Sequence, residues 1–300
     1  MNNKVNRSVS IKLINALFLF SAMLFLMNCS QRKVADSALS GQMTLAVDRQ
    51  LGDIASSQIE TFTRYYPDAA ITILPSGSNK TIKHLLSHNA RAAMISGEPG
   101  TAEDSLFTTM QRPLRREPVA RDAIICIVNR MSPVRKLSIK ELKSLFSGKV
   151  NNGILPLVTA DDYRLQSVFA AGVGIDKKDF KARGCSNETE LIRRVSTDNK
   201  AIGMLFRSSL DRGIKVDWIE KNIRIVPLAK EPDGISAYEP TQQNIFEGSY
   251  PLVTTVYYVY YSGDALAAGF GSWLSSSGQK AFERSSLAPY KAFERTIILK

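Results

Sequence analysis

The turn Ser76-Gly77-Ser78 has the composition of an anion-binding turn. It follows a run of apolar and β-branched residues, Ala70–Leu74, and precedes a segment with helical spacing. A helix N-terminus offers free backbone N–H groups and a partial positive charge, and serine hydroxyls add further donors. Such a turn can therefore bind an oxyanion. Serine is also a favoured N-cap whatever the function, so plain capping of the helix explains the same residues.

The histidines and cysteines form no catalytic or metal-binding pattern. His84 and His88 are four residues apart, a spacing that can bring two ligands to one helix face, but no third ligand accompanies them. Cys126 lies in an apolar strand pattern and Cys185 in a polar loop, which gives no indication of a disulfide. The sequence contains no Gly-x-Ser-x-Gly, Cys-x-x-Cys or phosphate-loop lysine motif. We expect a protein that is not an enzyme, with no cofactor and no metal.

Alternating strand and helix patterns must position the candidate turn. The first four strand patterns, separated by helical segments, are Met43–Val47, Ala70–Leu74, Arg91–Ser96 and Val119–Asn129. A capping box, Ser138-Ile139-Lys140-Glu141, opens a later helix, and the pattern ends with a long helix over 265–284 and a strand over 296–299. This alternation predicts an α/β fold with largely parallel sheets, in which ligands bind beyond the carboxyl ends of the strands.

The N-terminus has the pattern of an export signal with a lipid attachment site. Residues 1–15 carry three basic residues and no acid, and Ala16–Met27 is apolar except for one serine. This apolar run is too short to span a membrane but suits a secretory signal. Cys29 follows after Asn28 and resembles the acylated cysteine of a bacterial lipobox, although Asn28 stands where that pattern has a small residue. We expect residues 1–28 to be a lipoprotein signal peptide and Cys29 to be lipidated; ordinary cleavage that leaves a free cysteine is the alternative.

The positive charge of the chain is dispersed rather than concentrated in a binding stripe. The net charge of +11 falls to +8 when residues 1–28 are removed, and no basic run is interleaved with aromatic residues. Single-strand nucleic-acid binding needs such interleaving. We therefore expect a solvated cationic face and no binding to nucleic acid.

Eight short motifs, in order over residues 42–299, resemble the phosphate-type (PstS-like) substrate-binding proteins of ABC importers, a periplasmic-binding-protein family. Among them are Ser76-Gly77-Ser78 at a helix start, Ala93-Met94-Ile95-Ser96 at a strand end, and Gly248-Ser249-Tyr250-Pro251-Leu252 before a strand. The resemblance implies a two-lobed fold of type II, with two mostly parallel sheets joined by two crossover strands. It implies a tether over 29–41, a first lobe from 42–118 and 228–300, and a second lobe from 119–227.

The same resemblance suggests which residues bind the ligand. It assigns an oxyanion grip to Ser76, Gly77, Ser78 and Ser96, and Arg49 and Arg164 are the candidate cations. An arginine can offer two parallel N–H donors to an anion.

Several positions depart from the family pattern. Asp48 lies in the first loop, where the family has hydroxyl donors, and no Ser-Gly-Thr follows Arg164. Asp162 is expected to cap a helix from which Arg164 points into the cleft, but carboxylates there disfavour a dianion. Gly97 replaces a charged residue after Ser96, and the neighbouring Glu98 is either a proton acceptor for a bound oxyanion or a solvated loop acid.

From these features we expect an envelope lipoprotein that faces the periplasm. It would be a monomer that contacts the membrane through its lipid anchor and binds phosphate, or a related small anion, for an ABC permease or a sensor. One alternative is a scaffold or interaction lipoprotein that kept the fold and lost the phosphate site. Another is a protein that binds a different organic anion.

Overall fold

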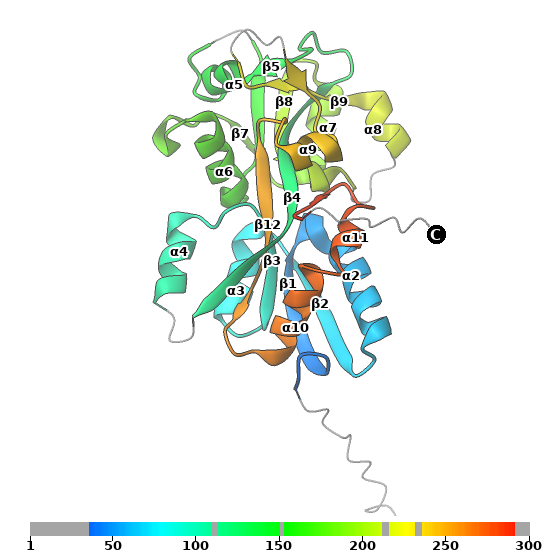
Figure 1. Cartoon of the computed structure of the whole chain (residues 1–300). Coiled ribbons are helices and arrows are strands. Elements are labelled where there is room, and N and C mark those ends of the chain that lie inside the picture. The colour runs from blue at the N-terminus through cyan, green and yellow to red at the C-terminus, as the bar shows by residue number, and fades with distance from the viewer. Residues whose placement is uncertain (1–35, 110–112, 151–152, 212–215, 232–235, 292–300) are drawn as a thin grey trace, which may run out of the picture. The chain divides into compact units, whose positions relative to one another are not determined.

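The computed structural model describes residues 36–109, 113–150, 153–211, 216–231 and 236–291 (Figure 1). The chain from Asp36 onward forms one compact unit. The expected signal peptide, Cys29, most of the tether and the strand expected over 296–299 lie outside the described residues. Among the described residues, no helix combines the length and the apolar character that a membrane span requires.

The first lobe, in the lower half of Figure 1, is built on a sheet of order β2-β1-β3-β12-β4. β1 pairs in parallel with β2 and β3, whereas β12 is antiparallel to β3 and β4. The elements of this lobe are β1 (Gly41–Asp48), η1 (Arg49–Leu51), α2 (Gly52–Tyr65), β2 (Ala69–Ser76), α3 (Ser78–Leu86), β3 (Ala92–Ser96), α4 (Thr101–Thr108), β12 (Val253–Tyr261), α10 (Ala265–Leu274), α11 (Gln279–Phe282) and β13 (Ala288–Pro289).

The second lobe continues the same run of strands through β4 (Leu114–Asn129), in the order β4-β8-β6-β7. β6 is parallel to both β7 and β8, and β4 is antiparallel to β8. A small three-stranded sheet has the order β11-β10-β5. The elements are β5 (Leu137–Ser138), α5 (Ile139–Phe146), β6 (Leu155–Thr159), α6 (Tyr163–Val173), η2 (Lys177–Asp179), β7 (Arg183–Cys185), α7 (Glu188–Thr197), β8 (Ala201–Phe206), η3 (Arg207–Asp211), α8 (Val216–Asn222), β9 (Ile223–Ile225), β10 (Leu228–Ala229), β11 (Ala237–Tyr238) and α9 (Gln242–Glu247).

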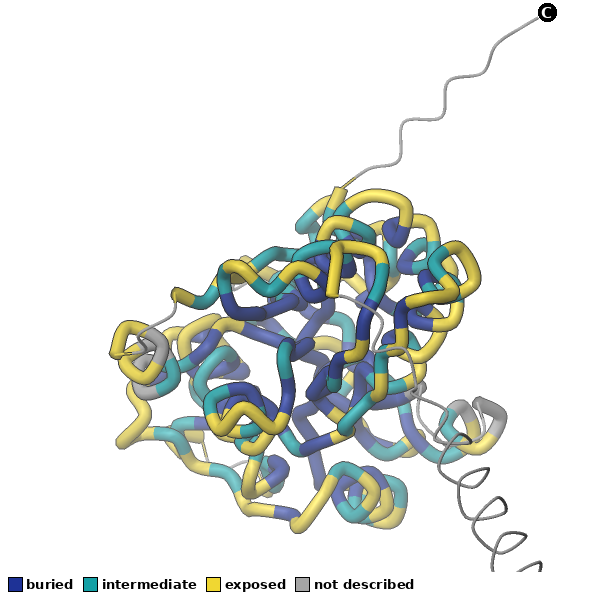
Figure 2. The backbone as a smooth tube through the Cα atoms, turned by 90° about the horizontal axis from the view of Figure 1, so that it is seen from below, coloured by how far each residue is buried: buried dark blue, intermediate teal, exposed yellow. Residues whose placement is uncertain are grey.

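Each lobe has its own apolar core, and Figure 2 shows the buried segments in the interior with exposed segments around them. In β1, Leu45 and Val47 pack on one face of the sheet and Ala46 on the other. A parallel sheet covered by helices on both faces needs such continuously apolar strands. The predicted two-lobed α/β fold is confirmed, but the sheets are mixed rather than mostly parallel. The parallel pairs lie around β1 and β6, while β12 and β4 pair antiparallel with their neighbours in one continuous run of strands.

The boundary between the lobes differs from the one expected over 228–300. Leu228, Ile245 and Tyr250 are buried in the core of the second lobe, and β10 pairs with β5 of that lobe. The chain returns to the first lobe along β12, whose first residue, Val253, still packs against the core of the second lobe. The sequence motifs did not predict this boundary, because the pattern of a short apolar segment does not indicate which sheet it packs against.

Local signals explain where several helices begin and end. The predicted capping box is confirmed: Ser138 Oγ accepts from the N–H of Glu141, and the Glu141 carboxylate accepts from the N–H of Ser138. The helix expected over 265–284 is instead two helices, α10 and α11, interrupted after Leu274. At the interruption, Gly278 approaches Gln58 and the carbonyl of Trp273 so closely that a Cβ there would lie less than 3.0 Å from both.

A buried carboxyl group lies where β4 passes from one lobe to the other. Asp122 is fully buried and accepts hydrogen bonds from Ser208 Oγ (2.6 Å) and from the N–H of Ala123 (2.7 Å). Burial raises the pKa of Asp122 to about 6, although these hydrogen bonds act in the opposite direction. The hydrogen bond from Ser208 joins η3 to β4 at the point where β4 passes between the lobes.

The raised pKa of Asp122 predicts a pH-dependent stability. Between about pH 4 and pH 6 the folded protein keeps a proton that the unfolded chain has released, so the free energy of unfolding falls as the pH rises through this window. For a pKa raised by about two units, the decrease is about 3 kcal/mol. We expect urea unfolding to show that the difference in the free energy of unfolding between the wild type and Asp122→Asn changes by this amount from pH 4 to pH 7. Parallel pH profiles would contradict the assignment.

Candidate functional site

The turn between β2 and α3 brings two serines to the carboxyl end of the first sheet. Ser76 and Ser78 are each 5% exposed. Gly77, not a serine, occupies the N-cap position of α3, and no side chain caps this helix. Ser78 Oγ instead donates to Asp162 Oδ1 of the second lobe, at 2.5 Å. The hydroxyl of Ser78 thus makes a contact between the lobes, and side-chain capping does not explain its position.

Arg164 joins the two lobes at the same place. The Asp162 carboxylate caps α6 by accepting from the N–H of Leu165, at 3.0 Å, and Arg164 lies in the first turn of this helix. Arg164 is 3% exposed, and its Nη2 donates to the carbonyl of Ser78, at 2.8 Å. The predicted cap and the predicted inward position of Arg164 are both observed.

Two carboxylates of the first lobe bind the Arg164 guanidinium. Nη1 donates to Asp48 Oδ2 at 2.5 Å, and Nη2 donates to Glu103 Oε1 at 3.0 Å. Asp48 ends β1 and is fully buried, while Glu103 lies in the first turn of α4. Glu103 also accepts from the N–H of Gly100, at 3.0 Å, so the start of α4 holds its carboxylate in place.

The charges of this cluster depend on its burial. Burial raises the pKa of Asp48 to about 6, against the opposing effect of Arg164, and burial also raises the pKa of Asp162. Burial alone would lower the pKa of Arg164, but Asp48 and Glu103 outweigh it, so the guanidinium stays charged. Up to three carboxylates therefore surround one cation, and any anion that enters must compete with them.

Two hydroxyl groups add hydrogen-bonding capacity at this end of the first sheet. Ser96 Oγ and Thr254 Oγ1 are buried and have no hydrogen-bond partner among the described residues. The N–H of Ser96 donates to Asp48 Oδ2, at 2.9 Å, which places Ser96 beside the carboxylate that binds Arg164. A buried hydroxyl without a partner costs about 1–3 kcal/mol, so both groups favour a ligand or water that can bond to them.

The backbone conformation and the close packing at position 97 both favour glycine. Its φ of +86° is in the left-handed region, and a Cβ would lie 3.0 Å from Val168 of the second lobe. The charged residue expected there from the family pattern would be strained and would hold the lobes apart. The neighbouring Glu98 accepts a hydrogen bond from the Tyr257 hydroxyl, so its carboxylate already has a partner.

The structure thus brings together some of the residues assigned from the sequence. Ser78, Ser96 and Arg164 meet at one cluster, with Ser76 and Gly77 at the adjoining turn. Arg49, by contrast, is exposed at the start of η1. Sequence reasoning missed Glu103, whose only signal was its place three residues after Gly100 at a helix start.

The chain belongs to the family described as the PBP superfamily domain, whose model matches residues 33–277. A solved structure similar to it is a candidate phosphate ABC transporter substrate-binding protein with bound phosphate from Clostridium perfringens, with a TM-score of 0.68 at 20% identity. The match covers 84% of this chain and 100% of that one.

Two other solved structures have a similar fold. An ABC-type phosphate transport receptor from Vibrio cholerae has a TM-score of 0.62 at 19% identity, covering 82% of this chain and 99% of that one. The reduced regulatory domain of OxyR2 from Vibrio vulnificus has a TM-score of 0.53 at 9% identity, covering 80% and 95%. Curated proteins give no match. At these identities the likeness shows the fold, and the function must be argued from the site.

The ion pairs of Arg164 predict a measurable loss of stability when the cation is removed. Arg164→Met leaves the buried carboxylate of Asp48 without its cation, which typically costs about 3–5 kcal/mol. We expect chemical denaturation to show a loss of this order at pH 7. Arg49→Met is the matched control, because this arginine is exposed and its removal should change the free energy by about 0.5 kcal/mol or less. Equal stability of the two variants would contradict the role given to Arg164.

Proposed function

We propose that this protein is a solute-binding lipoprotein of the cell envelope that binds phosphate, or a related small anion, between its lobes. The observation that carries the proposal is the meeting of Arg164 with the Ser78 turn, at 2.8 Å across the interlobe boundary. A helix start, buried hydroxyls and a guanidinium from the opposite lobe are the groups that grip an oxyanion. The printed descriptions of two solved relatives name phosphate, which supports this choice of ligand.

Binding would require Arg164 to change partners. The guanidinium is bonded to Asp48 and Glu103, so an anion must displace at least one carboxylate or enter when that carboxylate is protonated. Affinity then reflects a competition between the ligand and the chain's own acids. Delivery to an ABC permease or to a sensor would follow from opening and closing of the lobes around the ligand.

The first experiment is calorimetric titration of residues 30–300 with phosphate, after ligand has been stripped by unfolding and refolding. We expect binding that is lost in Arg164→Met and weakened about tenfold or more in Ser78→Ala, because a hydrogen bond to a charged group contributes about 1.5–3 kcal/mol. Sulfate, molybdate and phosphorylated sugars follow as competing ligands. If no anion gives heat or a thermal shift, anion binding is excluded.

Asp48→Asn provides a sharper test, because it removes a competing charge and keeps the shape of the side chain. We expect phosphate to bind at least about tenfold more tightly, since a unit charge a few ångströms away contributes more than about 1.4 kcal/mol in a partly buried site. The difference in phosphate affinity between Asp48→Asn and the wild type should shrink as the pH falls through 6, because Asp48 of the wild type then takes up a proton. An unchanged affinity at every pH would show that Asp48 does not compete with the ligand.

A second candidate function is that of a scaffold or interaction lipoprotein. The observation that favours it is the neutralisation of Arg164 by Asp48 and Glu103, which gives the cation partners within the chain. The titration separates the candidates, because a scaffold would bind no anion even when Asp48 is replaced by Asn.

Lipid anchoring is proposed from the sequence pattern around Cys29. We expect the full-length protein, produced in a bacterium that acylates lipoproteins, to incorporate labelled palmitate and to sediment with membranes. Cys29→Ser should abolish the label and release the protein to the soluble fraction of the envelope. Cys185→Ser is the matched control, because this cysteine is buried in the folded unit and its removal should leave labelling unchanged. Labelling that persists in Cys29→Ser would exclude this attachment site.

A further inference from the structure

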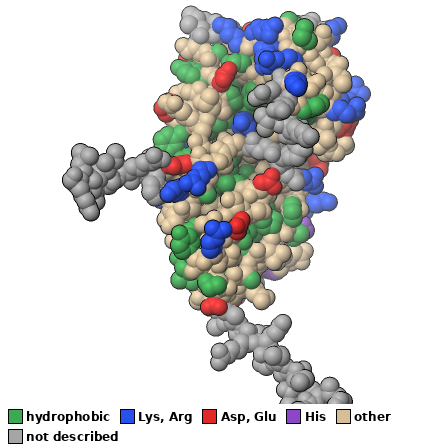
Figure 3. Space-filling view, turned by 90° about the vertical axis from the view of Figure 1, so that its right-hand side faces the viewer, with side chains coloured by type: hydrophobic (Ala, Val, Ile, Leu, Met, Phe, Trp, Pro, Cys, Tyr) green, Lys and Arg blue, Asp and Glu red, His purple; other side chains and the backbone are tan. Residues whose placement is uncertain are grey.

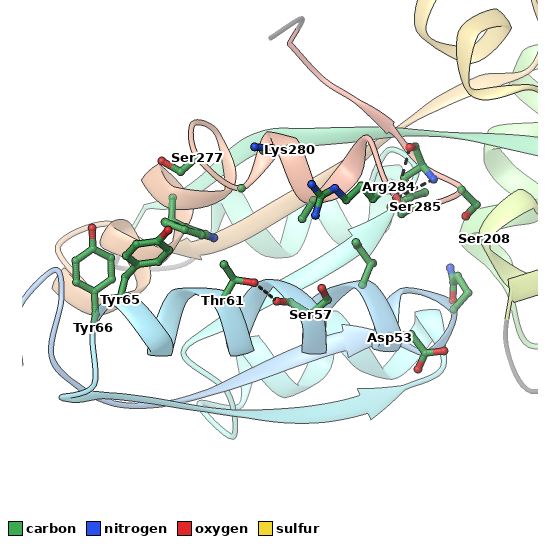
Figure 4. Close-up of a pocket in the computed structure, with 17 residues that line it drawn as sticks. Asp53, Ser57, Thr61, Tyr65, Tyr66, Ser208, Ser277, Lys280, Arg284 and Ser285 are labelled. Carbon is green, nitrogen blue, oxygen red and sulfur yellow. Dashed lines mark hydrogen bonds between the residues drawn. The ribbon is translucent and has the colours of Figure 1, made fainter. Parts of the chain in front are cut away.

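A groove with a volume of about 910 Å³ lies apart from the Arg164 cluster, between α2 and the chain around α11 (Figure 4). It shares no lining residue with that cluster. Lys and Arg side chains are spread over the face of the molecule in Figure 3, with more of them toward the second lobe. The groove is far larger than a phosphate ion needs, so its shape points to a different kind of ligand.

One face of α2 forms a long wall of the groove. Asp53, Ser57, Thr61 and Tyr65 line it and recur every four residues, which places them along one side of the helix. At 1.5 Å per residue this side is about 18 Å long. An extended chain rises about 3.3 Å per residue, so the groove can hold about five or six extended residues.

Aromatic side chains form one end of the groove. Tyr65 is 68% exposed, and its ring centroid lies 5.6 Å from that of Trp273. Trp273 Nε1 donates to Gln58 Oε1 at 3.1 Å, and the Trp273 ring also contacts Tyr66, so the indole is held in place before any ligand arrives. Exposed, rigid aromatic residues are the side chains that most often dominate binding at protein interfaces.

Two cations line the wall opposite α2. Lys280 and Arg284 are exposed and four residues apart, and neither side chain has an ion pair with the described residues. Figure 4 shows Ser57 and Thr61 on the side of α2 that faces Arg284. Asp53 is the acidic residue that lines the groove in the part of the chain the structure describes. The groove therefore favours a ligand that carries negative charge.

A buried amide marks the other end of the groove. Gln50 lines it, is 6% exposed, and its Nε2 has no hydrogen-bond partner among the described residues. Ser208 lies at the same end (Figure 4). A buried N–H group without a partner is costly, and a carbonyl oxygen supplied by a ligand would satisfy it.

We propose that this groove binds an extended, acidic peptide segment of a partner protein. An aromatic or large apolar side chain of the segment packs on Tyr65 and Trp273, its carboxylates meet Lys280 and Arg284, and a backbone carbonyl accepts from Gln50. The length of the groove favours a peptide over a small anion. Lys280 and Arg284, which have no ion pair with the residues that the structure describes, favour acidic over basic or neutral segments.

The test is selection from a displayed library of random octapeptides on immobilised residues 30–300, which include the whole compact unit. We expect enrichment of peptides that combine two or more acidic residues with one aromatic residue. Synthetic copies should bind the wild type and shift the fluorescence of Trp273 in a Trp218→Phe background, which leaves Trp273 as the one tryptophan. Saturating inorganic phosphate should not displace them, which separates this site from the proposed anion site.

Charge reversal supplies the decisive comparison. Lys280→Glu/Arg284→Glu should weaken the selected peptides at least tenfold. Lys177→Glu/Lys178→Glu makes the same change of net charge at exposed lysines in η2 of the other lobe and should leave binding unchanged. The proposal would be overturned if the selected peptides showed no acidic pattern, or if both double variants weakened binding equally. It would also be overturned if binding survived the charge reversal at Lys280 and Arg284.

Discussion

The burial of one guanidinium governs how the two lobes meet. Arg164 crosses from α6 to the end of β1, where the buried Asp48 binds it at 2.5 Å. Removing two charges from water is costly, and their attraction compensates only when the geometry is good and other hydrogen bonds are satisfied. Ser78 and Glu103 meet that requirement by accepting from the same guanidinium. The start of α4, the turn before α3 and the start of α6 are thereby fixed relative to one another.

The sequence predicted the elements better than the contacts between them. Strand β1, the capping box of α5 and the cap of α6 follow from local patterns of burial and capping, which is why they could be predicted. The inward position of Arg164 was also predicted, but from the family resemblance, which implies an arginine at a helix start of the second lobe. Its partners were not, because Asp48, Glu103 and Arg164 are distant in the sequence and no local pattern records a contact made only after the sheets assemble.

The buried interlobe cluster and the groove beside α2 carry opposite balances of charge. The interlobe cluster concentrates acids around one cation, although the chain as a whole carries a net charge of +11. The groove beside α2 has the opposite balance, with Lys280 and Arg284 lining it. Net charge alone therefore identifies neither site, and only the position of each side chain on its element does so.

The contacts that close the lobes are made by the chain's own side chains. Ser78 bonds to Asp162 and Asp48 bonds to Arg164, so each lobe supplies both a donor and an acceptor to the other. A ligand that entered at this point would therefore exchange bonds rather than add them, because Arg164 is already bonded to Asp48 and Glu103. The free energy with which such a ligand holds the lobes together would then be a difference between two sets of contacts, its own and those of the carboxylates that it replaces.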